Sequence, residues 1–203
     1  MIAIMDYGVG NLFSLKSSLA MIGAEAVVTG DQAVIRAADR IILPGVGAFG
    51  DARRKLAETG LDRMICEAAA GGKPLLGICL GMQMLFDRSL EYGEHEGLSL
   101  IPGEVVPLAG RIPQALKVPH IGWNALEMKK PDHPLMKYTK SGDCVYFVHS
   151  FYASRCEEST VAVSEYGMDV TAAVARENVM GCQFHPEKSG KAGLDILRAF
   201  CEV

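Results

Sequence analysis

The chain lacks the features of a membrane protein or a secreted protein. None of its apolar runs approaches the roughly 18 residues that a membrane-spanning helix needs. The N-terminal apolar stretch is short and no basic region precedes it, which argues against a signal peptide. Clusters of positive charge are also missing, since the net charge is −4 and no basic run is longer than Arg53-Arg54-Lys55. We therefore expect a cytoplasmic protein that binds neither a membrane nor nucleic acid.

Paired cysteines and clustered metal ligands are absent too. The six cysteines are widely scattered and contain no C-x-x-C pair: Cys66, Cys79, Cys144, Cys156, Cys182 and Cys201. This pattern predicts buried free thiols in a reducing compartment. His120 has no partner at metal-ligand spacing, and His95 and His133 lie in polar segments that we expect at the surface. The sequence therefore predicts neither a metal nor a cofactor.

The length and composition suit one domain with a sizeable core. The 203 residues are 49% hydrophobic and 22% charged, which is ordinary for a globular protein. No linker, repeat or low-complexity segment divides the chain. We therefore predict a single domain over residues 1–203.

The first half alternates short apolar runs with helical patterns. Strands are predicted over residues 2–7, 25–29, 40–44 and 74–79. The apolar residues of the first predicted helix recur at helical spacing, at Leu12, Leu15, Leu19 and Ile22. Asn11 can cap this helix and Gly23 can end it, and a long helix is predicted over about 49–70. Such alternation favours a parallel sheet covered by helices, with ligands at the carboxyl ends of the strands.

The second half is richer in short strands and prolines. Candidate strands cover residues 117–121, 144–149, 160–165, 170–176 and 179–184. Residues 189–201 are predicted to form a closing helix. We expect several of the strands to pair antiparallel on one flank of the sheet. The whole pattern predicts an α/β fold with a central, mostly parallel sheet, helices on both faces and an antiparallel β-rich flank.

Residues 77–81, Gly-Ile-Cys-Leu-Gly, have the pattern of a nucleophile elbow, in which a strand turns sharply into a helix. Glycines two residues before and after Cys79 leave room for such a strained turn. The thiol would lie at a helix N-terminus, where free N–H groups favour negative charge. An unperturbed cysteine, with a pKa of about 8.5, is only a few per cent thiolate at neutral pH. A buried cysteine beside turn glycines is the alternative, and the pattern favours a nucleophile at Cys79.

A base for this nucleophile is expected at His185. The apolar stretch from Val179 to Phe184 leads into His185, so this residue also lies where a strand ends. Glu187 follows two residues later, and strand alternation would place both side chains on one side of the chain. A carboxylate there could orient the imidazole while its other nitrogen faces the thiol. A lone His-x-Glu is usually only a surface feature, but with the elbow it predicts a triad of Cys79, His185 and Glu187.

Glycines also follow the third predicted strand, in Pro44-Gly45-Val46-Gly47. They let the backbone approach a ligand and turn its N–H groups toward it. Acyl transfer needs such donors at the developing oxyanion, and we expect them at Val46 or Gly47 and at Leu80. A phosphate-binding loop is the usual alternative, but the segment lacks the Lys-Ser/Thr of a P-loop.

Together these motifs resemble the class I (triad) glutamine amidotransferase family. The resemblance is carried by Gly77-Ile78-Cys79-Leu80-Gly81-Met82-Gln83 and Phe184-His185-Pro186-Glu187. Within that family, further segments resemble the glutaminase subunits of imidazole glycerol phosphate synthase, namely residues 5–12, 44–47, 118–124 and 146–150. The resemblance covers essentially the whole chain and implies the flavodoxin-like fold of the family.

The resemblance also implies a reaction and a partner. The chain would hydrolyse glutamine to glutamate and ammonia, as one half of a heterodimer. The ammonia would pass to a separate cyclase subunit, a (β/α)8 barrel, which makes imidazole glycerol phosphate in histidine biosynthesis. A closed path would keep ammonia neutral and away from solvent. Turnover is expected to be weak in the isolated chain and to rise on docking, with the Gly45–Gly47 loop as the switch.

Further site residues follow from the resemblance. Glutamine would be held by Gln83, Glu91 and the segment around His149 and Ser150. Gln83 lies one helical turn past Cys79 and can reach the same mouth. The next position, Phe151, departs from the tyrosine that is frequent in the family, which weakens it as a binding residue.

The surface that docks on the cyclase is expected to include Asn11, Trp123, Asn124 and Lys188. Trp is a common interface anchor, although a core position for Trp123 is nearly as plausible from the sequence alone.

Three alternatives stay open at this point. One is the glutaminase of another pathway, such as pyridoxal phosphate synthesis. A second is a stand-alone γ-glutamyl hydrolase or peptidase that needs no partner. A third is a noncatalytic glutamine-sensing subunit, against which the intact Cys79, His185 and Glu187 argue.

Overall fold

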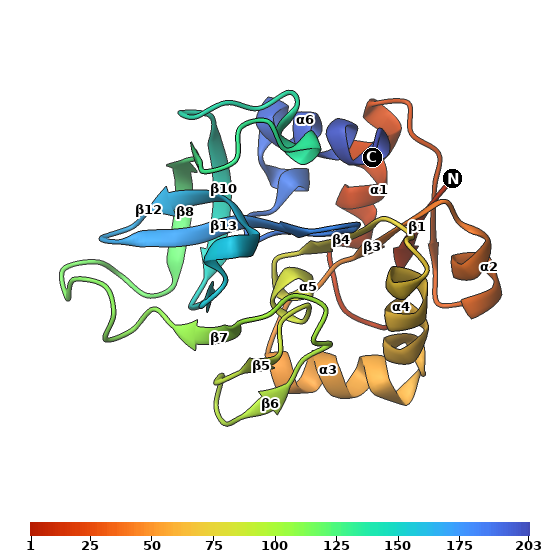
Figure 1. Ribbon diagram of the computed structural model, residues 1–203, viewed down its shortest axis with the longest axis horizontal. Coiled ribbons are helices and arrows are strands. Elements are labelled where there is room, and N and C mark those ends of the chain that lie inside the picture. Colours follow the sequence, from red (N-terminus) through yellow and green to blue (C-terminus); the bar gives the residue numbers. More distant parts are fainter.

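A central sheet of eight strands organises the fold. The computed structural model describes residues 1–203. In spatial order the strands are β2 (Ala26–Thr29), β1 (Ile2–Met5), β3 (Arg40–Leu43), β4 (Leu75–Ile78), β14 (Val179–Cys182), β13 (Asp169–Arg176), β12 (Thr160–Glu165) and β9 (Glu127–Met128) (Figure 1). The strands from β2 to β14 run parallel, and those from β13 to β9 continue the sheet antiparallel. The predicted mostly parallel sheet with an antiparallel flank is confirmed.

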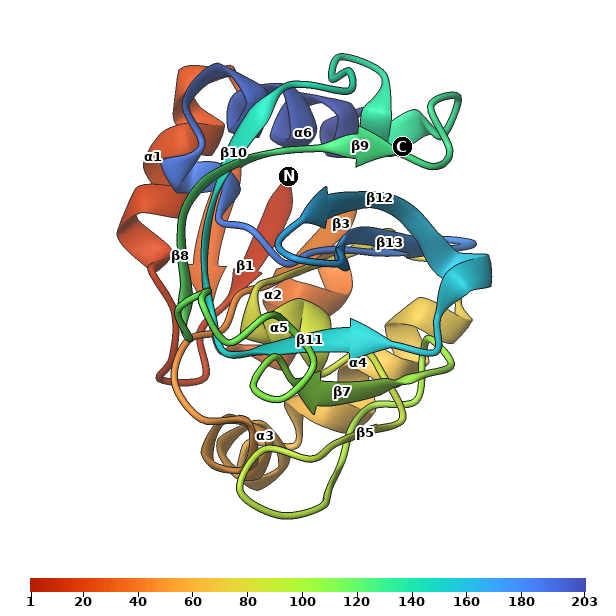
Figure 2. The ribbon, with the colours of Figure 1, turned by 90° about the vertical axis from the view of Figure 1, so that its left-hand side faces the viewer.

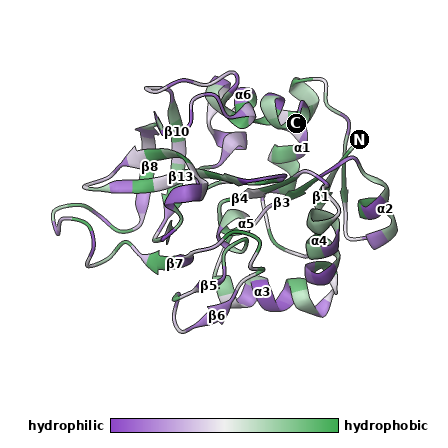
Figure 3. Cartoon of the chain, viewed as in Figure 1, coloured by the Kyte–Doolittle hydropathy of each residue, from purple (hydrophilic) through white to green (hydrophobic).

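Helices cover both faces of this sheet, as predicted. One face carries α1 (Leu12–Met21) and α6 (Gly190–Cys201), and the other carries α2 (Gln32–Ala37), α3 (Phe49–Glu58) and α4 (Leu61–Ala70) (Figure 1). Side chains along β1 point alternately to the two faces of the sheet. Ile2 and Ile4 pack with the first group of helices, and Ala3 and Met5 pack with the second. Figure 3 shows the result: the central strands β1 and β4 are mainly hydrophobic, whereas α3 carries many hydrophilic residues.

The predicted helix over 49–70 is wrong as a single element, because α3 and α4 are separate. Gly60 lies between them with φ of +70°, a left-handed conformation that glycine adopts without strain. Apolar positions continue on both sides, with Leu56 before the break and Leu61 and Ile65 after it, so periodicity alone does not show the turn. Helix α2 was not predicted; the Asp31 side chain caps it by accepting from the Ala33 N–H.

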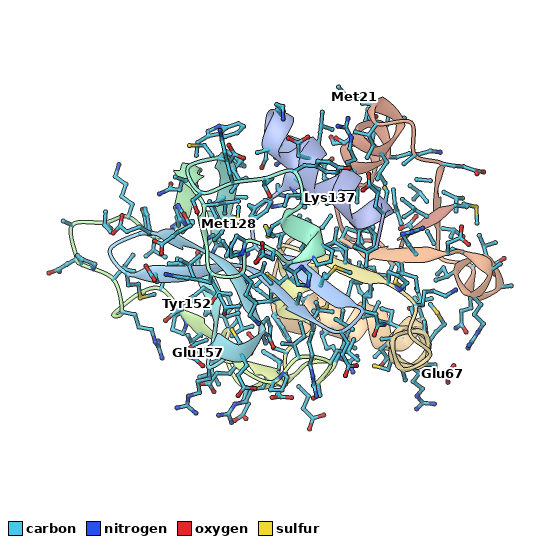
Figure 4. All side chains as sticks on the ribbon, turned by 45° about the horizontal axis from the view of Figure 1, so that its top comes forward. Met21, Glu67, Met128, Lys137, Tyr152 and Glu157 are labelled. Carbon is cyan, nitrogen blue, oxygen red and sulfur yellow. The ribbon has the colours of Figure 1, made fainter.

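The ends of the first helix match the prediction in position. Asn11 is the N-cap residue of α1, but its side chain makes no capping hydrogen bond, which corrects the expected cap. Gly23 follows the last turn with φ of +76°. Met21 projects from the outer end of α1 (Figure 4) and is 75% exposed.

The second half forms two smaller sheets as well as the antiparallel flank. β8 (His120–Ala125) pairs antiparallel with β10 (Cys144–His149) as a separate ribbon beside the main sheet (Figure 2). β8 begins after Pro119 rather than at residue 117 as predicted, because proline has no N–H to give to a ladder. An unpredicted sheet consists of β11 (Phe151–Ser154), β7 (Glu104–Pro107), β5 (Arg88–Ser89) and β6 (His95–Glu96).

Short helical turns complete the chain. They are α5 (Leu80–Gln83), η1 (Pro134–Met136), η2 (Glu157–Ser159) and η3 (Pro186–Lys188). The loop after η1 is fastened to the end of α6, where Lys137 Nζ lies 2.6 Å from a Glu202 carboxylate oxygen (Figure 4).

The burial of the cysteines differs from the prediction. Cys79, Cys156 and Cys182 are buried, but Cys66 and Cys201 are half-buried and Cys144 is exposed, because it opens the edge strand β10. All are free thiols. No helix has both the length and the apolar character needed to cross a membrane.

Candidate active site

Cys79 lies on a strained turn between β4 and α5. Its φ of +54° is rare for a residue with a side chain. The flanking glycines are sterically required: a Cβ on Gly77 would lie 2.7 Å from the Gly81 carbonyl oxygen, and one on Gly81 only 1.9 Å from the Leu43 oxygen. The predicted nucleophile elbow is therefore present, with its thiol at the carboxyl edge of the parallel strands.

His185 and Glu187 form a buried pair. The His185 Nδ1–H donates to Glu187 Oε1 at 2.9 Å, and both side chains are less than 5% exposed. The chain turns into η3 after His185, so a 3-10 turn brings the two side chains together rather than the strand alternation expected from the sequence. This hydrogen bond fixes the tautomer and leaves Nε2 free for the thiol.

The electrostatics of His185 couple it to Cys79. Burial, the largest influence, would lower the pKa of His185. Hydrogen bonds and charge interactions with Cys79 and Glu187 outweigh it and raise the pKa to about 9. An imidazole in this environment holds a proton at neutral pH and can release it to a leaving group.

The glycine loop after β3 packs directly against the elbow. A Cβ on Gly45 would lie 2.7 Å from the Gly81 nitrogen, so only glycine permits this approach. The Tyr7 hydroxyl donates to the Pro44 carbonyl at 2.7 Å and holds the start of the loop. Burial raises the pKa of Tyr7 well above its ordinary value, so the hydroxyl stays a donor.

A cavity of about 380 Å³ joins these parts. Its lining includes nearly every residue expected at the active site: Val46, Gly47, Cys79, Leu80, Gln83, Glu91, His149, Ser150 and His185. Lys188 also lines it. Glu187 does not line the cavity; it contacts His185 through the hydrogen bond at Nδ1. The cavity has room for an amino acid, and it places the thiol and the imidazole on the same space.

Gln83, expected to bind glutamine, is itself fixed by hydrogen bonds to neighbouring residues. Gln83 Nε2 donates to the Phe151 carbonyl at 3.0 Å and to Gln183 Oε1 at 2.9 Å. Its own Oε1 takes no part in these bonds and can meet a ligand. Phe151 contributes through its backbone, so the missing tyrosine hydroxyl does not affect this contact.

Glu91 connects the cavity to the glycine loop. One carboxylate oxygen accepts from the Phe49 N–H at 2.6 Å, at the start of α3 and just after the loop. Burial raises the pKa of Glu91, partly offset by this hydrogen bond. The residue lies between β5 and β6, in a segment that the sequence leaves irregular.

Gln183 touches the nucleophile and was missed by the sequence analysis. It is fully buried just after β14, and its Nε2 donates to Cys79 Sγ at 3.7 Å while its Oε1 accepts from Gln83. A polar residue inside the otherwise apolar stretch 179–184 was the available signal. The amide supplies a donor to a sulfur that becomes negative during reaction.

Replacing Gln183 by leucine is expected to lower kcat for the reaction at Cys79, expected from the resemblance to be glutamine hydrolysis, by about tenfold to a hundredfold, because one hydrogen bond to a charged group is lost. Steady-state kinetics with glutamine measure this. Ser164→Ala is the matched control: it also removes the hydrogen bond of a fully buried side chain on the main sheet, to the Ala125 carbonyl, but far from Cys79 in the sheet order. Equal losses in both variants would contradict a specific role for Gln183.

The expected docking residues cluster beside the triad. Trp123 on β8 is 53% exposed and packs edge-on against Tyr146 of β10, with ring centroids 6.0 Å apart. The Lys188 ammonium lies 5.8 Å from the centre of the same Tyr146 ring. Asn11 lies beside Glu187 around a small cavity, and Asn124 is half-buried on β8. The structure thus brings Asn11, Trp123 and Lys188 close to the triad, whereas Asn124 contacts His120 and the Glu165 carbonyl.

Comparison with known proteins identifies the family. The sequence profile "Glutamine amidotransferase class-I" matches residues 3–202. The chain belongs to the class I glutamine amidotransferase family. Within it, the chain is 50% identical to imidazole glycerol phosphate synthase subunit HisH of Caldanaerobacter subterraneus subsp. tengcongensis, over 100% of this chain and 98% of that one. The subunit HisH of Wolinella succinogenes is 46% identical over 100% of both chains.

Solved structures agree with this class I amidotransferase fold. A crystal structure of a glutamine amidotransferase superposes with a TM-score of 0.77 at 20% identity, covering 99% of this chain and 97% of that one. PurLQS from Thermotoga maritima gives a TM-score of 0.74 at 20% identity, with the same coverage. The predicted fold and the resemblance are both confirmed.

Proposed function

We propose that this chain is the glutaminase subunit of an imidazole glycerol phosphate synthase and supplies ammonia for histidine biosynthesis. The observation that carries this proposal is the convergence of the Cys79 elbow with the buried His185–Glu187 pair in one cavity. The whole-length similarity to HisH subunits supports the pathway.

The first half of the reaction forms a covalent intermediate. His185 accepts the proton of the Cys79 thiol, and the thiolate attacks the side-chain amide carbon of glutamine. Glu187 keeps the His185 Nδ1–H pointed toward itself, so Nε2 faces the sulfur. The tetrahedral intermediate collapses as His185 gives its proton to the departing ammonia. A glutamyl thioester remains on Cys79.

The second half releases glutamate. Neutral His185 takes a proton from water, which attacks the thioester carbonyl, and the thiol leaves reprotonated. The pKa of about 9 keeps the proton on His185 while the charged sulfur of Cys79 attacks. Acylation removes that charge and its contribution to the pKa, so after giving its proton to ammonia the ring stays neutral and can act as the base.

The oxyanion of both steps is stabilised by backbone N–H groups. The Leu80 amide, one residue past the nucleophile, supplies one donor, and Val46 or Gly47 supplies the other. Gly47 has φ of +93°, a conformation that glycine adopts without strain, and glycine can also take other backbone conformations at little cost, so an amide in the loop can turn. This freedom makes the loop the element through which docking raises turnover.

The charged groups of glutamine itself are held by protein groups of opposite charge. The Glu91 carboxylate suits the substrate ammonium, and the free Oε1 of Gln83 accepts an N–H from the substrate. Ser150 and the Lys188 ammonium lie on the same cavity and suit the substrate carboxylate. His149 lines the same cavity and supports its wall, because both of its ring nitrogens already contact the protein.

The partner is a cyclase subunit with a (β/α)8 barrel, which docks as a heterodimer on Asn11, Trp123, Asn124 and Lys188. Support comes from the names of the relatives, which are subunits of a synthase, and from the exposed aromatic and cationic groups beside the triad. Ammonia in neutral water is mostly ammonium, so a covered path to the second active site preserves the nucleophile. The free thiols suit a reducing compartment such as the cytoplasm.

Glutamine turnover measured with and without the cyclase subunit and its nucleotide substrate tests this proposal. We expect slow hydrolysis by the isolated chain, faster hydrolysis in the complex, and one glutamine consumed for each imidazole glycerol phosphate made. Full-speed hydrolysis by the isolated chain, unaffected by the cyclase, would instead identify a stand-alone hydrolase.

A further inference from the structure

Two buried histidines outside the triad are hydrogen-bonded to each other. His120 on β8 and His149 on β10 are only 1% and 6% exposed. His120 Nδ1 lies 3.0 Å from His149 Nε2. His149 lines the cavity, whereas His120 lies behind it. The steps of the proposed reaction use neither ring as an acid or a base, so the pair needs another explanation.

Each ring has a second partner that can only accept a hydrogen. His149 Nδ1 lies 2.8 Å from the Phe151 carbonyl oxygen, so this nitrogen must carry a hydrogen. His120 Nε2 lies 3.0 Å from Asn124 Oδ1, while Asn124 Nδ2 donates to the Glu165 carbonyl at 3.1 Å. With the Asn124 amide in this orientation, His120 Nε2 would have to carry a hydrogen too. A hydrogen bond between the rings needs a third N–H hydrogen, but two neutral imidazoles carry only two.

The surroundings of the pair disfavour a third proton. Phe147 of β10 and Tyr166, which follows β12, stack on His120 with centroids 4.8 Å and 3.9 Å away. No carboxylate side chain hydrogen-bonds to either ring. The titratable side chains that share the cavity with His149 are His185, Glu91, Lys188 and Cys79.

Burial is the largest influence on both rings. It lowers the pKa of His149 to about 4, with the charges of His120 and His185 acting in the same direction and the bond to Phe151 opposing them. It also lowers the pKa of His120, against the opposing bond to Asn124. The pair therefore holds two protons at neutral pH.

With two protons, the orientation of the Asn124 amide decides which contacts survive. While Oδ1 faces His120, two lone pairs must oppose each other at one of three contacts: between His120 and Asn124, between the two rings, or between His149 and the Phe151 carbonyl. A half-turn of the amide removes the conflict: Nδ2 donates to His120 Nε2, His120 Nδ1–H donates to His149, and His149 Nδ1–H donates to Phe151. Only the exposed bond to Glu165 is lost, and water can replace it.

We propose that His120 is a positioning residue for the glutamine pocket, acting through His149, and that the Asn124 amide selects its tautomer. The proposal rests on the proposed function in one respect, that this pocket binds glutamine. Asn124 is half-buried and its bond to the Glu165 carbonyl is exposed, so a partner group that hydrogen-bonds to the amide there shifts the tautomer of His120. The tautomer shift then strengthens or breaks the hydrogen bond from His149 to the Phe151 carbonyl, which lies on the pocket wall.

Two-bond 15N–1H correlation spectra of the full chain labelled with 15N-histidine read which ring nitrogens carry hydrogen. At neutral pH we expect His120 to carry it on Nδ1 in the wild type. In Asn124→Asp, whose carboxylate only accepts, we expect a hydrogen on His120 Nε2. Tyr166→Phe is the control, because it keeps the stacked ring and loses only the hydroxyl bonded to the Lys117 carbonyl. An unchanged protonation pattern of His120 in Asn124→Asp overturns the proposal.

Kinetics of the complex with the cyclase subunit provide a second readout. His120→Phe keeps an aromatic ring in the stack but frees His149, so we expect KM for glutamine to rise about tenfold, as for one lost hydrogen bond, with a smaller change in kcat. A wild-type KM in His120→Phe also overturns the proposal. If the tautomer shifts as expected but the complex does not hydrolyse glutamine, the proposed function fails while the tautomer switch stands.

Discussion

Replacement of Cys79 by alanine is expected to abolish glutamine-dependent synthesis of imidazole glycerol phosphate and to leave ammonia-dependent synthesis intact. Without the sulfur no glutamyl thioester forms, and the loss of a nucleophile costs on the order of a thousandfold in rate or more. Ammonia added to the solution bypasses the glutaminase and still reaches the cyclase. Rates of product formation from glutamine and from an ammonium salt, measured on the same complex, test both parts.

Cys144→Ala is the matched control for this substitution. It removes an exposed thiol at the start of β10, away from the cavity, and should leave both activities at the wild-type level. Loss of the ammonia-dependent activity in Cys79→Ala would show that the cysteine supports the complex rather than the chemistry.

Replacement of Glu187 by glutamine is expected to lower the glutaminase rate by about a hundredfold to ten-thousandfold, since the base loses the carboxylate that orients and stabilises its protonated form. The same change should shift the alkaline limb of the pH–rate profile. His185 has a pKa raised to about 9, and Glu187 contributes to that rise, whereas burial opposes it. Without the carboxylate the pKa falls, so activity that depends on protonated His185 should disappear at a lower pH.

The pH profile of kcat, measured on the wild type and on Glu187→Gln, separates orientation from simple destabilisation. Glu25→Gln removes the same charge from an exposed position before β2 and should leave the profile unchanged. An alkaline limb that stays in place in Glu187→Gln would mean that the carboxylate does not set the protonation of His185.

Much of this site could be predicted because steric and chemical demands are local there. The elbow needs glycine at 77 and 81, since the nearest backbone atoms leave no room for a Cβ, and that demand is visible as a spacing in the sequence. The His-x-Glu spacing was equally visible, although a 3-10 turn and not strand alternation brings the two side chains together. The parallel strands were predictable from continuous apolar runs. The single domain over residues 1–203 stays a prediction.

The features that could not be predicted depend on contacts between residues that are distant in sequence. Gln183 reaches Cys79 from a neighbouring strand, and His120 meets His149 only because β8 and β10 pair in one register. Gln183 does stand out as a polar residue in an apolar stretch, but nothing local shows that either side chain has a role beyond that of a satisfied buried polar group. The break at Gly60 was overlooked for the opposite reason, because an apolar stripe continued across it and outweighed a single glycine.

The covalent state of Cys79 during turnover tests the central claim most directly. The complex is mixed with glutamine, quenched in acid within one turnover and digested, and the peptide that contains Cys79 is weighed by mass spectrometry. We predict one glutamyl group on this peptide, present in the wild type and absent in Cys79→Ala. Rapid glutamine hydrolysis with the glutamyl group on another residue, or with none on any residue in a quench fast enough to trap it, would contradict the account.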